Sequence, residues 1–307
     1  MDPSKAPPER PPSLLLGASF STRLGAVDFL LECIGFPPGV DERALSELVR
    51  ERGEPAPWRG PGGVHLRLSL ADGLELRLDG ETATAPQSLL PFFRVPHRLR
   101  VAVGSLASAV DSPFDAVLTG VANPPPPSAE LADAEPGSFP FTTWLSDARR
   151  LPASVRPGQV LAVSSAGFAL DVTYVGPNDG GADSRVLGLP RGASIRLVSD
   201  PHEPQANAGK DACLDAGPGA VDGCVELSAR VRSLRRLTNP LTDRTVELCE
   251  VDAPGRPLQL FISPWHLEEE GLPSPRPGWR VEGAFLFQGR VVGGLPGPSA
   301  RARLVFG

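Results

Sequence analysis

The chain has 307 residues, of which 41% are hydrophobic and 21% are charged, and its net charge is −6. This length exceeds the roughly 100 to 200 residues of a typical domain, so we expect several modules rather than one undivided core. No apolar run approaches the ~20 residues that span a bilayer, and the acidic balance argues against a surface shaped throughout for nucleic acid.

The N-terminus and the cysteines favour a cytoplasmic protein. Residues 1–13 are rich in proline and charge and lack periodicity, which predicts a disordered leader. The apolar stretch that follows, Leu14 to Leu16, is too short for a secretory signal. None of the four cysteines belongs to a C-x-x-C pair. The sequence leaves open whether Cys213 and Cys224 form a disulfide. The cations are nearly all arginine, as is typical of a GC-rich bacterial genome.

Residues 14–96 are predicted to form a small α+β module with two helices and a β-hairpin. The segment from Ser21 to Ile34 has one apolar helical stripe, and DERALSELVRERG follows with Asp41 as N-cap and Gly53 as terminator. In VHLRLSLADGLELRLDG the leucines alternate with polar residues around an Ala-Asp-Gly turn. This alternation predicts two strands that bury one leucine face.

The rest of the chain contains a repeated phrase. WLSDARRLPASVRPG begins at Trp144 and WHLEEEGLPSPRPG begins at Trp265, and both read Trp, six residues, Leu-Pro and then Arg-Pro-Gly. The similarity extends upstream to Val103 and Val231, from which Ser-Leu, Pro, Asp and Val recur in order. We expect the two tryptophans to occupy the same place, where each packs the corner between a strand and a short helix.

Each copy has the order strand, strand, strand, short helix, turn, strand and closing strand, which is the order of a five-stranded Greek-key barrel. We therefore predict a mainly β fold with tandem OB-like barrels from an internal duplication, at residues 97–176 and 226–307. Residues 177–225 are rich in Gly, Pro and Asp and predict a linker with one strand at ASIRLVS. A sandwich of seven or more strands is the rival fold, and copies of only about 80 residues favour the barrel.

The basic strand ARVRSLRR of the second copy is the first candidate site. Alternation places Arg230, Arg232 and Arg236 on one face, where barrels of this order often bind single-stranded nucleic acid or oligosaccharide. The second copy has 11 arginines against 9 acidic residues, so ordinary solvated arginines are the competing interpretation. The aromatic residues expected nearby as stacking surfaces, or else as core residues, are Phe261, Trp265, Trp279 and Phe287.

A second candidate lies in GFALDVTYVG. Its D-x-x-Y-x-G pattern, with Asp171, Tyr174 and Gly176, resembles the substrate-loop motif of trimeric dUTP pyrophosphatases, and the resemblance implies that Asp and Tyr handle a deoxyribose. It covers about ten residues, and the family's P-R-S-G motif and glycine-rich tail do not occur in this chain. Alternation puts Asp171 and Tyr174 on opposite faces of a strand, with Tyr174 on the core side, which favours a closing barrel strand.

No other pattern points to catalysis, a metal or a cofactor. The acidic stretch around His202, Cys213 and Cys224 has no ligand spacing typical of metal sites, and we expect a solvated loop. The charge run at Glu268, Glu269 and Glu270 is expected to be a solvated helix face. The sequence also contains no P-loop, no G-x-S-x-G elbow and no G-x-G-x-x-G after a strand.

These patterns favour a non-enzymatic cytoplasmic binding or adaptor protein that uses its barrel surfaces to bind another protein. Binding of single-stranded nucleic acid through Arg230, Arg232 and Arg236 is the alternative. An enzyme related to the dUTP pyrophosphatases is the third hypothesis, and it depends on the D-x-x-Y-x-G pattern alone. We expect no cofactor, metal or membrane partner.

Overall fold

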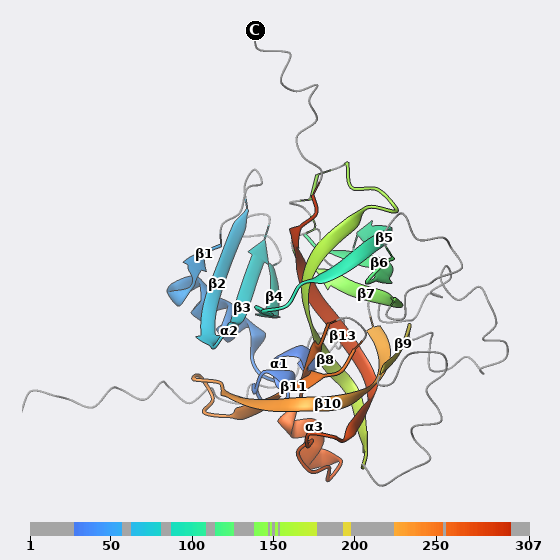
Figure 1. Ribbon diagram of the computed structural model, residues 1–307. Coiled ribbons are helices and arrows are strands. Elements are labelled where there is room, and N and C mark those ends of the chain that lie inside the picture. The colour runs from blue at the N-terminus through green and yellow to red at the C-terminus, as the bar shows by residue number, and fades with distance from the viewer. Residues whose placement is uncertain are drawn as a thin grey trace, which may run out of the picture.

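Figure 1 shows the computed structural model, in which a small sheet with helices lies beside a larger sheet. Over the residues that it describes the protein is mainly β, as predicted, with a small helical N-terminal part. The predicted leader and most of the predicted linker lie outside these residues. The described residues are 28–56, 63–80, 87–108, 114–125, 138–146, 148, 151–152, 154–176, 193–197, 224–253 and 256–295.

The N-terminal part consists of two helices and a four-stranded antiparallel sheet. The side chain of Asp41 accepts hydrogen bonds from the backbone N–H groups of Arg43 and Ala44, which confirms the predicted N-cap. The helices are α1 (Asp28–Cys33) and α2 (Glu42–Arg52), and the strands, in sheet order, are β1 (Glu54–Pro55), β2 (Val64–Ala71), β3 (Leu74–Gly80) and β4 (Gln87–Phe93).

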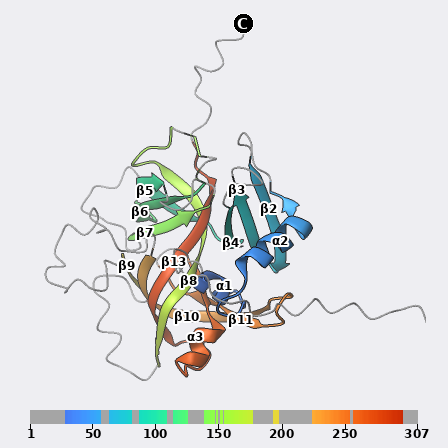
Figure 2. The same ribbon diagram turned by 180° about the vertical axis from the view of Figure 1, so that it is seen from behind.

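The predicted hairpin is formed by β2 and β3, and its turn has positive φ at Asp72 and Gly73. The leucines of β3 pack in one cluster with Leu45 and Val49 of α2, which lies across this sheet in Figure 2. The prediction of a single buried face is wrong for β3, because its polar residues are buried as well. Among them, Arg77 donates a hydrogen bond to Ser146, the residue that directly follows β7 of the larger sheet.

The larger sheet contains nine strands within the described residues, with α3 (Pro264–Glu269) between β12 and β13. The strand predicted at ASIRLVS is present as β9 and pairs with β10. The nine strands are β5 (Leu99–Ser108), β6 (Ala116–Ala122), β7 (Phe139–Leu145), β8 (Val160–Val175), β9 (Ala193–Leu197), β10 (Cys224–Thr238), β11 (Thr245–Val251), β12 (Leu258–Ile262) and β13 (Arg280–Gly293).

The pairings of these strands close two rings that share β8 and β13. In the first ring β5, β6 and β7 form a meander, β7 pairs in parallel with β13, and β13 returns through β8 to β5. In the second ring β10, β11 and β12 form a meander, β12 pairs in parallel with β8, and β8 returns through β13 to β10. Figure 1 shows β8 and β13 running side by side through the middle of this sheet.

The two rings have the same irregularity at the same point of the meander. The register of β5 against β6 shifts between Val103 and Ser105, and the register of β10 against β11 shifts between Val231 and Ser233. Each shift adds one residue to the first strand of the meander, which is a β-bulge. The sequence Val-x-Ser-Leu therefore adopts one conformation twice.

The Arg-Pro-Gly segment also has the same structure in both places. Gly158 and Gly278 have φ values of 83° and 88°, a region that glycine enters without a steric penalty. The N–H of Gly158 donates to the carbonyl of Val103, and the N–H of Gly278 donates to the carbonyl of Val231. Each turn thus fixes the start of a long strand against the bulge of its ring.

The long strands differ from the expected order of a fourth strand and a separate closing strand. β8 passes without interruption from β5 of the first ring to β12 of the second, and β13 passes from β10 to β7. The segment Ser164 to Gly167 lacks a turn signal, and a Cβ at Gly167 would approach the side chain of Leu260 to 2.7 Å. The glycine therefore marks close packing of the two strands and not a turn.

The prediction that Trp144 and Trp265 occupy the same place is wrong. Trp144 lies within β7 and pairs with Gln288, whereas Trp265 lies in the first turn of α3. Phe261 is the residue of the second ring that matches Trp144, because it pairs with Phe168 in the corresponding parallel contact. The shared phrase was misleading because the strand before it ends one residue after Trp144 but three residues before Trp265.

Candidate ligand-binding pocket

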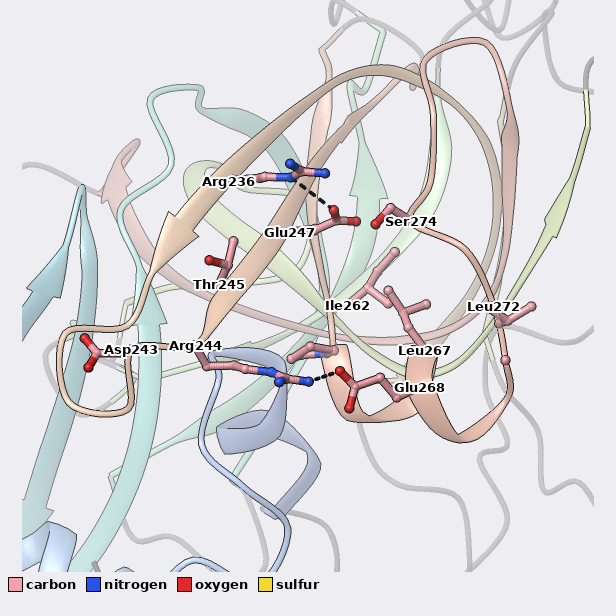
Figure 3. Close-up of a pocket in the computed structure, with 12 residues that line it drawn as sticks. Arg236, Asp243, Arg244, Thr245, Glu247, Ile262, Leu267, Glu268, Leu272 and Ser274 are labelled. Carbon is pink, nitrogen blue, oxygen red and sulfur yellow. Dashed lines mark hydrogen bonds and ion pairs between the residues drawn. The ribbon is translucent and has the colours of Figure 1, made fainter. Parts of the chain in front are cut away.

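A pocket of about 780 Å³ opens at one end of the second ring. Figure 3 shows that its residues come from the ends of β10 and β11, from the end of β12 and from α3 with the turn that follows. Part of its wall is apolar, formed by Ile262, Leu267 and Leu272. The charged residues that line it are Arg236, Asp243, Arg244, Glu247 and Glu268.

Local sequence signals place α3 beside the pocket. Ser263 is the N-cap, with its hydroxyl accepting hydrogen bonds from the N–H groups of Trp265 and His266, and Pro264 occupies the first turn, where its missing N–H costs nothing. Leu267 is buried under this helix. The helix therefore directs Leu267 into the pocket wall and leaves Glu268 exposed at the rim.

The pocket contains two ion pairs of different character. Arg236 Nε lies 3.4 Å from Glu247 Oε1, and the side chains are 68% and 10% exposed, so an exposed cation lies over a buried carboxylate. Glu247 Oε2 is buried and has no hydrogen-bond partner. Arg244 forms an ion pair with Glu268, and its guanidinium lies 4.2 Å from the ring centre of Trp265.

Groups behind Glu247, inside the second ring, are kept neutral by burial. Burial raises the pKa of Tyr174 above its ordinary value, and the neighbouring Cys249 and Glu247 raise it further. Burial likewise raises the pKa of Cys249, with a smaller contribution from Glu247. A buried thiol with a raised pKa is a poor nucleophile at neutral pH, so this interior favours packing over catalysis.

The three arginines of the predicted basic strand do not share one face. The bulge after Val231 inserts one residue and reverses the alternation of the strand. Arg232 lies 3.9 Å from both Glu250 and Asp252, on one side of β11, whereas Arg236 lies beside Glu247, on the other side. Arg230 precedes the bulge and is exposed. The predicted row of guanidinium groups is therefore interrupted.

The predicted stacking residues are largely unavailable to a ligand. Phe261 and Phe287 are fully buried, and Phe261 stacks on Phe168 at 5.3 Å between ring centres. Trp265 is half-buried, and its Nε1 donates to the carbonyl of Phe36 at 2.7 Å. Trp279 is half-buried next to Tyr174. Packing is thus the observed role of these aromatic rings.

The D-x-x-Y-x-G segment forms the end of β8. Asp171 is exposed and lies 3.9 Å from His266, whereas the ring of Tyr174 packs against the core of the large sheet. The Tyr174 hydroxyl is buried and has no hydrogen-bond partner. The expected placement on opposite faces is therefore observed, and this geometry does not bring the two side chains to one substrate.

Several expected features can be examined only within the described residues. There, no three His, Cys, Asp or Glu side chains lie together as potential metal ligands, and no helix combines the length and apolarity needed to cross a membrane. Cys33 and Cys249 are free and buried. Cys213 and His202 lie outside the described residues, as does the side chain of Cys224, so the structure describes no part of a possible Cys213–Cys224 disulfide.

Sequence reasoning did not identify this pocket. Glu268 is exposed, as expected, and it also pairs with Arg244 of the β10–β11 turn. The opposite charges of Arg236 and Glu247 could have indicated a polar site. The hairpin register that pairs these two residues depends on the bulge, however, and the bulge was not predicted.

Comparisons with known proteins give no guidance on this site. The chain matches no known protein-family model, and no significant match is found among curated proteins or solved structures.

Proposed function

We propose that this chain is a non-enzymatic binding or adaptor protein that binds another protein, with the pocket of the second ring as its principal contact. The observation that carries this proposal is the pocket itself, which combines an apolar wall with charges of both signs. Such a surface suits a protein segment, because apolar side chains supply affinity and paired charges supply orientation.

We further propose that the two rings are OB-like barrels derived from an internal duplication. The same strand order, the same bulge and the same Arg-Pro-Gly turn in both rings support this origin. In this proposal each barrel takes its fifth strand from a long strand that begins in the other. The pocket then lies at the mouth of the second barrel, where ligand sites often occur.

Single-stranded nucleic acid is the less supported ligand. Polyanion binding needs cations that are free to contact phosphates along a continuous track. Arg232 and Arg236 instead approach carboxylates on different sides of β11, and Phe261 is fully buried. No comparable observation favours the nucleotide-hydrolase hypothesis.

The experiment is an affinity purification from native lysate, followed by reconstitution with the purified candidate partner. The bait proteins are the unchanged chain, Leu272→Glu in the pocket wall, and Leu295→Glu, an exposed control beyond β13. We expect a stoichiometric complex with the unchanged chain and the control, and at least about tenfold weaker binding with Leu272→Glu. Equal binding by all three proteins would contradict the role of the pocket.

A parallel measurement separates the nucleic-acid alternative. Fluorescence anisotropy with labelled oligothymidylate is recorded at about 50 and 200 mM salt, with and without the Arg230, Arg232 and Arg236 to Ala changes. We expect no salt-dependent binding at micromolar protein. Binding that falls with salt and disappears in the triple variant would replace the protein-partner proposal.

A further inference from the structure

We infer that the pocket receives a basic side chain, lysine or arginine, of the partner protein, and that Glu247 is its counter-charge. This inference depends on the proposed function and specifies the chemistry of the partner. The charges that line the pocket are three carboxylates against two guanidinium groups, so their sum is negative: Asp243, Glu247 and Glu268 against Arg236 and Arg244.

Glu247 is the residue in the pocket that most lacks a partner. Its side chain is only 10% exposed, and its single ion pair, with Arg236, involves Oε1 at 3.4 Å. Oε2 is buried without a hydrogen bond. A buried carboxylate with an unsatisfied oxygen is costly, and a second donor nearby would lower that cost.

Arg236 occupies the position that the incoming cation would take. It is 68% exposed, so its guanidinium can move into solvent when the incoming cation takes over the pairing with the buried Glu247. Arg244 is held more firmly, because it pairs with Glu268 and lies over the Trp265 ring. In Figure 3 the two arginines lie on opposite sides of the pocket.

The apolar wall matches the stem of a long basic side chain. Lysine and arginine bury their methylene groups along apolar surface while the charged end reaches a polar partner. Ile262, Leu267 and Leu272 line the same pocket as Glu247.

The first ring supplies an internal comparison. Arg236 pairs with Glu247 across β10 and β11, and in the same register Ser108 pairs with Ala116 across β5 and β6. The first ring therefore closes without either charge at this position. Asp115, next to Ala116, is buried as well, but it does not occupy the position of Glu247, so this architecture does not require a carboxylate at that position.

An anionic partner group is the opposite possibility. An anion bound to Arg236 or Arg244 would lie close to Glu247 or Glu268, the carboxylate that already pairs with that arginine, and would meet the negative sum of the lining charges. The buried Glu247 cannot move into solvent as the exposed Arg236 can. The pocket is therefore better matched to a cation.

Methyl NMR provides a direct test because the chain has only three isoleucines. Ile262 lines the pocket, whereas Ile34 is buried in the core cluster beside the N-terminal sheet and reports on the rest of the structure. The probes are N-acetyl-arginine amide, its uncharged analogue N-acetyl-norleucine amide and the anionic N-acetyl-glutamate amide. They are titrated separately into the full chain labelled at the isoleucine δ1 methyl groups.

We expect the arginine probe to shift the Ile262 signal saturably, with much smaller shifts from the other two probes. Glu247→Gln should weaken binding of the arginine probe about tenfold, since it removes a charged acceptor. Arg236→Gln should strengthen binding, because it removes the competing cation. An effect of Arg236→Gln in this direction would not arise if the residue only stabilised the fold.

Several results would overturn the inference. These are an unchanged Ile262 signal, equal shifts from the norleucine probe, preferential binding of the glutamate probe, or binding unaffected by Glu247→Gln while Ile34 reports an intact fold. If a partner protein still requires Leu272 in the purification experiment, the proposed function stands without this inference. If the arginine probe binds but no partner complex depends on Leu272, the proposed function fails and the pocket is a site for a free cationic ligand.

Discussion

The two rings share their pairing pattern, their bulge and their Arg-Pro-Gly turn, yet they differ at the rim. Ser108 and Ala116 of the first ring are small, whereas Arg236 and Glu247 of the second ring carry charge and line a pocket. The features common to both rings determine how strands meet and turn. The features that differ are therefore the better guide to ligand chemistry.

The largest expected effect on stability comes from a substitution in β13 where this strand packs into the first ring. Phe287 belongs to β13 and is fully buried. Its ring centre lies 5.2 Å from that of Phe141 of the first ring. Phe287→Ala should lower the free energy of unfolding by about 3 to 5 kcal/mol, because it leaves a cavity in the core. Urea denaturation measures this loss, and hydrogen exchange should show lost protection in β5 to β7. Leu295→Ala, at an exposed position, should change stability by less than about 0.5 kcal/mol.

A somewhat smaller effect is expected where the two long strands touch. A Cβ at Gly283 would clash with the carbonyl oxygen of Asp171 in β8. Gly283→Val should therefore destabilise the protein by about 3 kcal/mol through displaced backbone. Gly176, just after β8, has open space around it, and Gly176→Ala should be close to neutral in the same denaturation assay. Equal effects at both glycines would contradict close contact of β8 with β13.

The tryptophans of the repeated phrase offer a matched pair. Trp265 Nε1 donates to the carbonyl of Phe36, whereas Trp144 Nε1 is buried without a partner. Trp265→Phe should cost about 1 kcal/mol more than Trp144→Phe, because it removes a hydrogen bond and leaves a carbonyl unpaired. Thermal denaturation gives the difference, and amide exchange around α1 should rise only for Trp265→Phe. A larger cost for Trp144→Phe would reverse this assignment.

The smallest effect concerns the interior of the second ring. The pKa of Tyr174 is raised by burial, so the folded state keeps the proton at a pH where the unfolded state loses it. The contribution of Tyr174 to the free energy of unfolding is fully present below pH 10. It declines as the pH rises above 10, by up to about 1.4 kcal/mol per pH unit. Tyr174→Phe should be within about 0.5 kcal/mol of the unchanged protein at pH 7, because the hydroxyl has no partner. Urea denaturation at rising pH should show a shallower decline above pH 10 for the variant, and parallel profiles would contradict the raised pKa.

Local signals in the sequence predicted local structure well. Asp41 caps α2, Asp72 and Gly73 form the hairpin turn, and the Pro-Gly steps precede β8 and β13. Each of these features depends on residues within one or two turns of chain. Their physical causes, capping and backbone conformation, are therefore visible in a short window.

The features that sequence reasoning missed depend on distant partners. No residue near Ser164 indicates that β8 continues into the second ring, because this continuation depends on pairing with β12. The bulge at Arg232 reversed the alternation on which the arginine face was predicted. The pocket required the bulge, α3 and the β10–β11 turn together, and no single segment contains all three.

The shared strands also set the order in which this protein can mature during synthesis. The first ring is closed by Gln288 and Gly289, which lie almost at the end of the described chain, although its meander begins near Leu99. Domains usually fold as they emerge from the ribosome, N-terminal part first. Here the earlier meander must wait for the last strand, with its open edges available to wrong pairings in the meantime. We therefore expect recovery of soluble protein to depend on the rate of translation between residues 145 and 280, even though the finished molecule is unchanged.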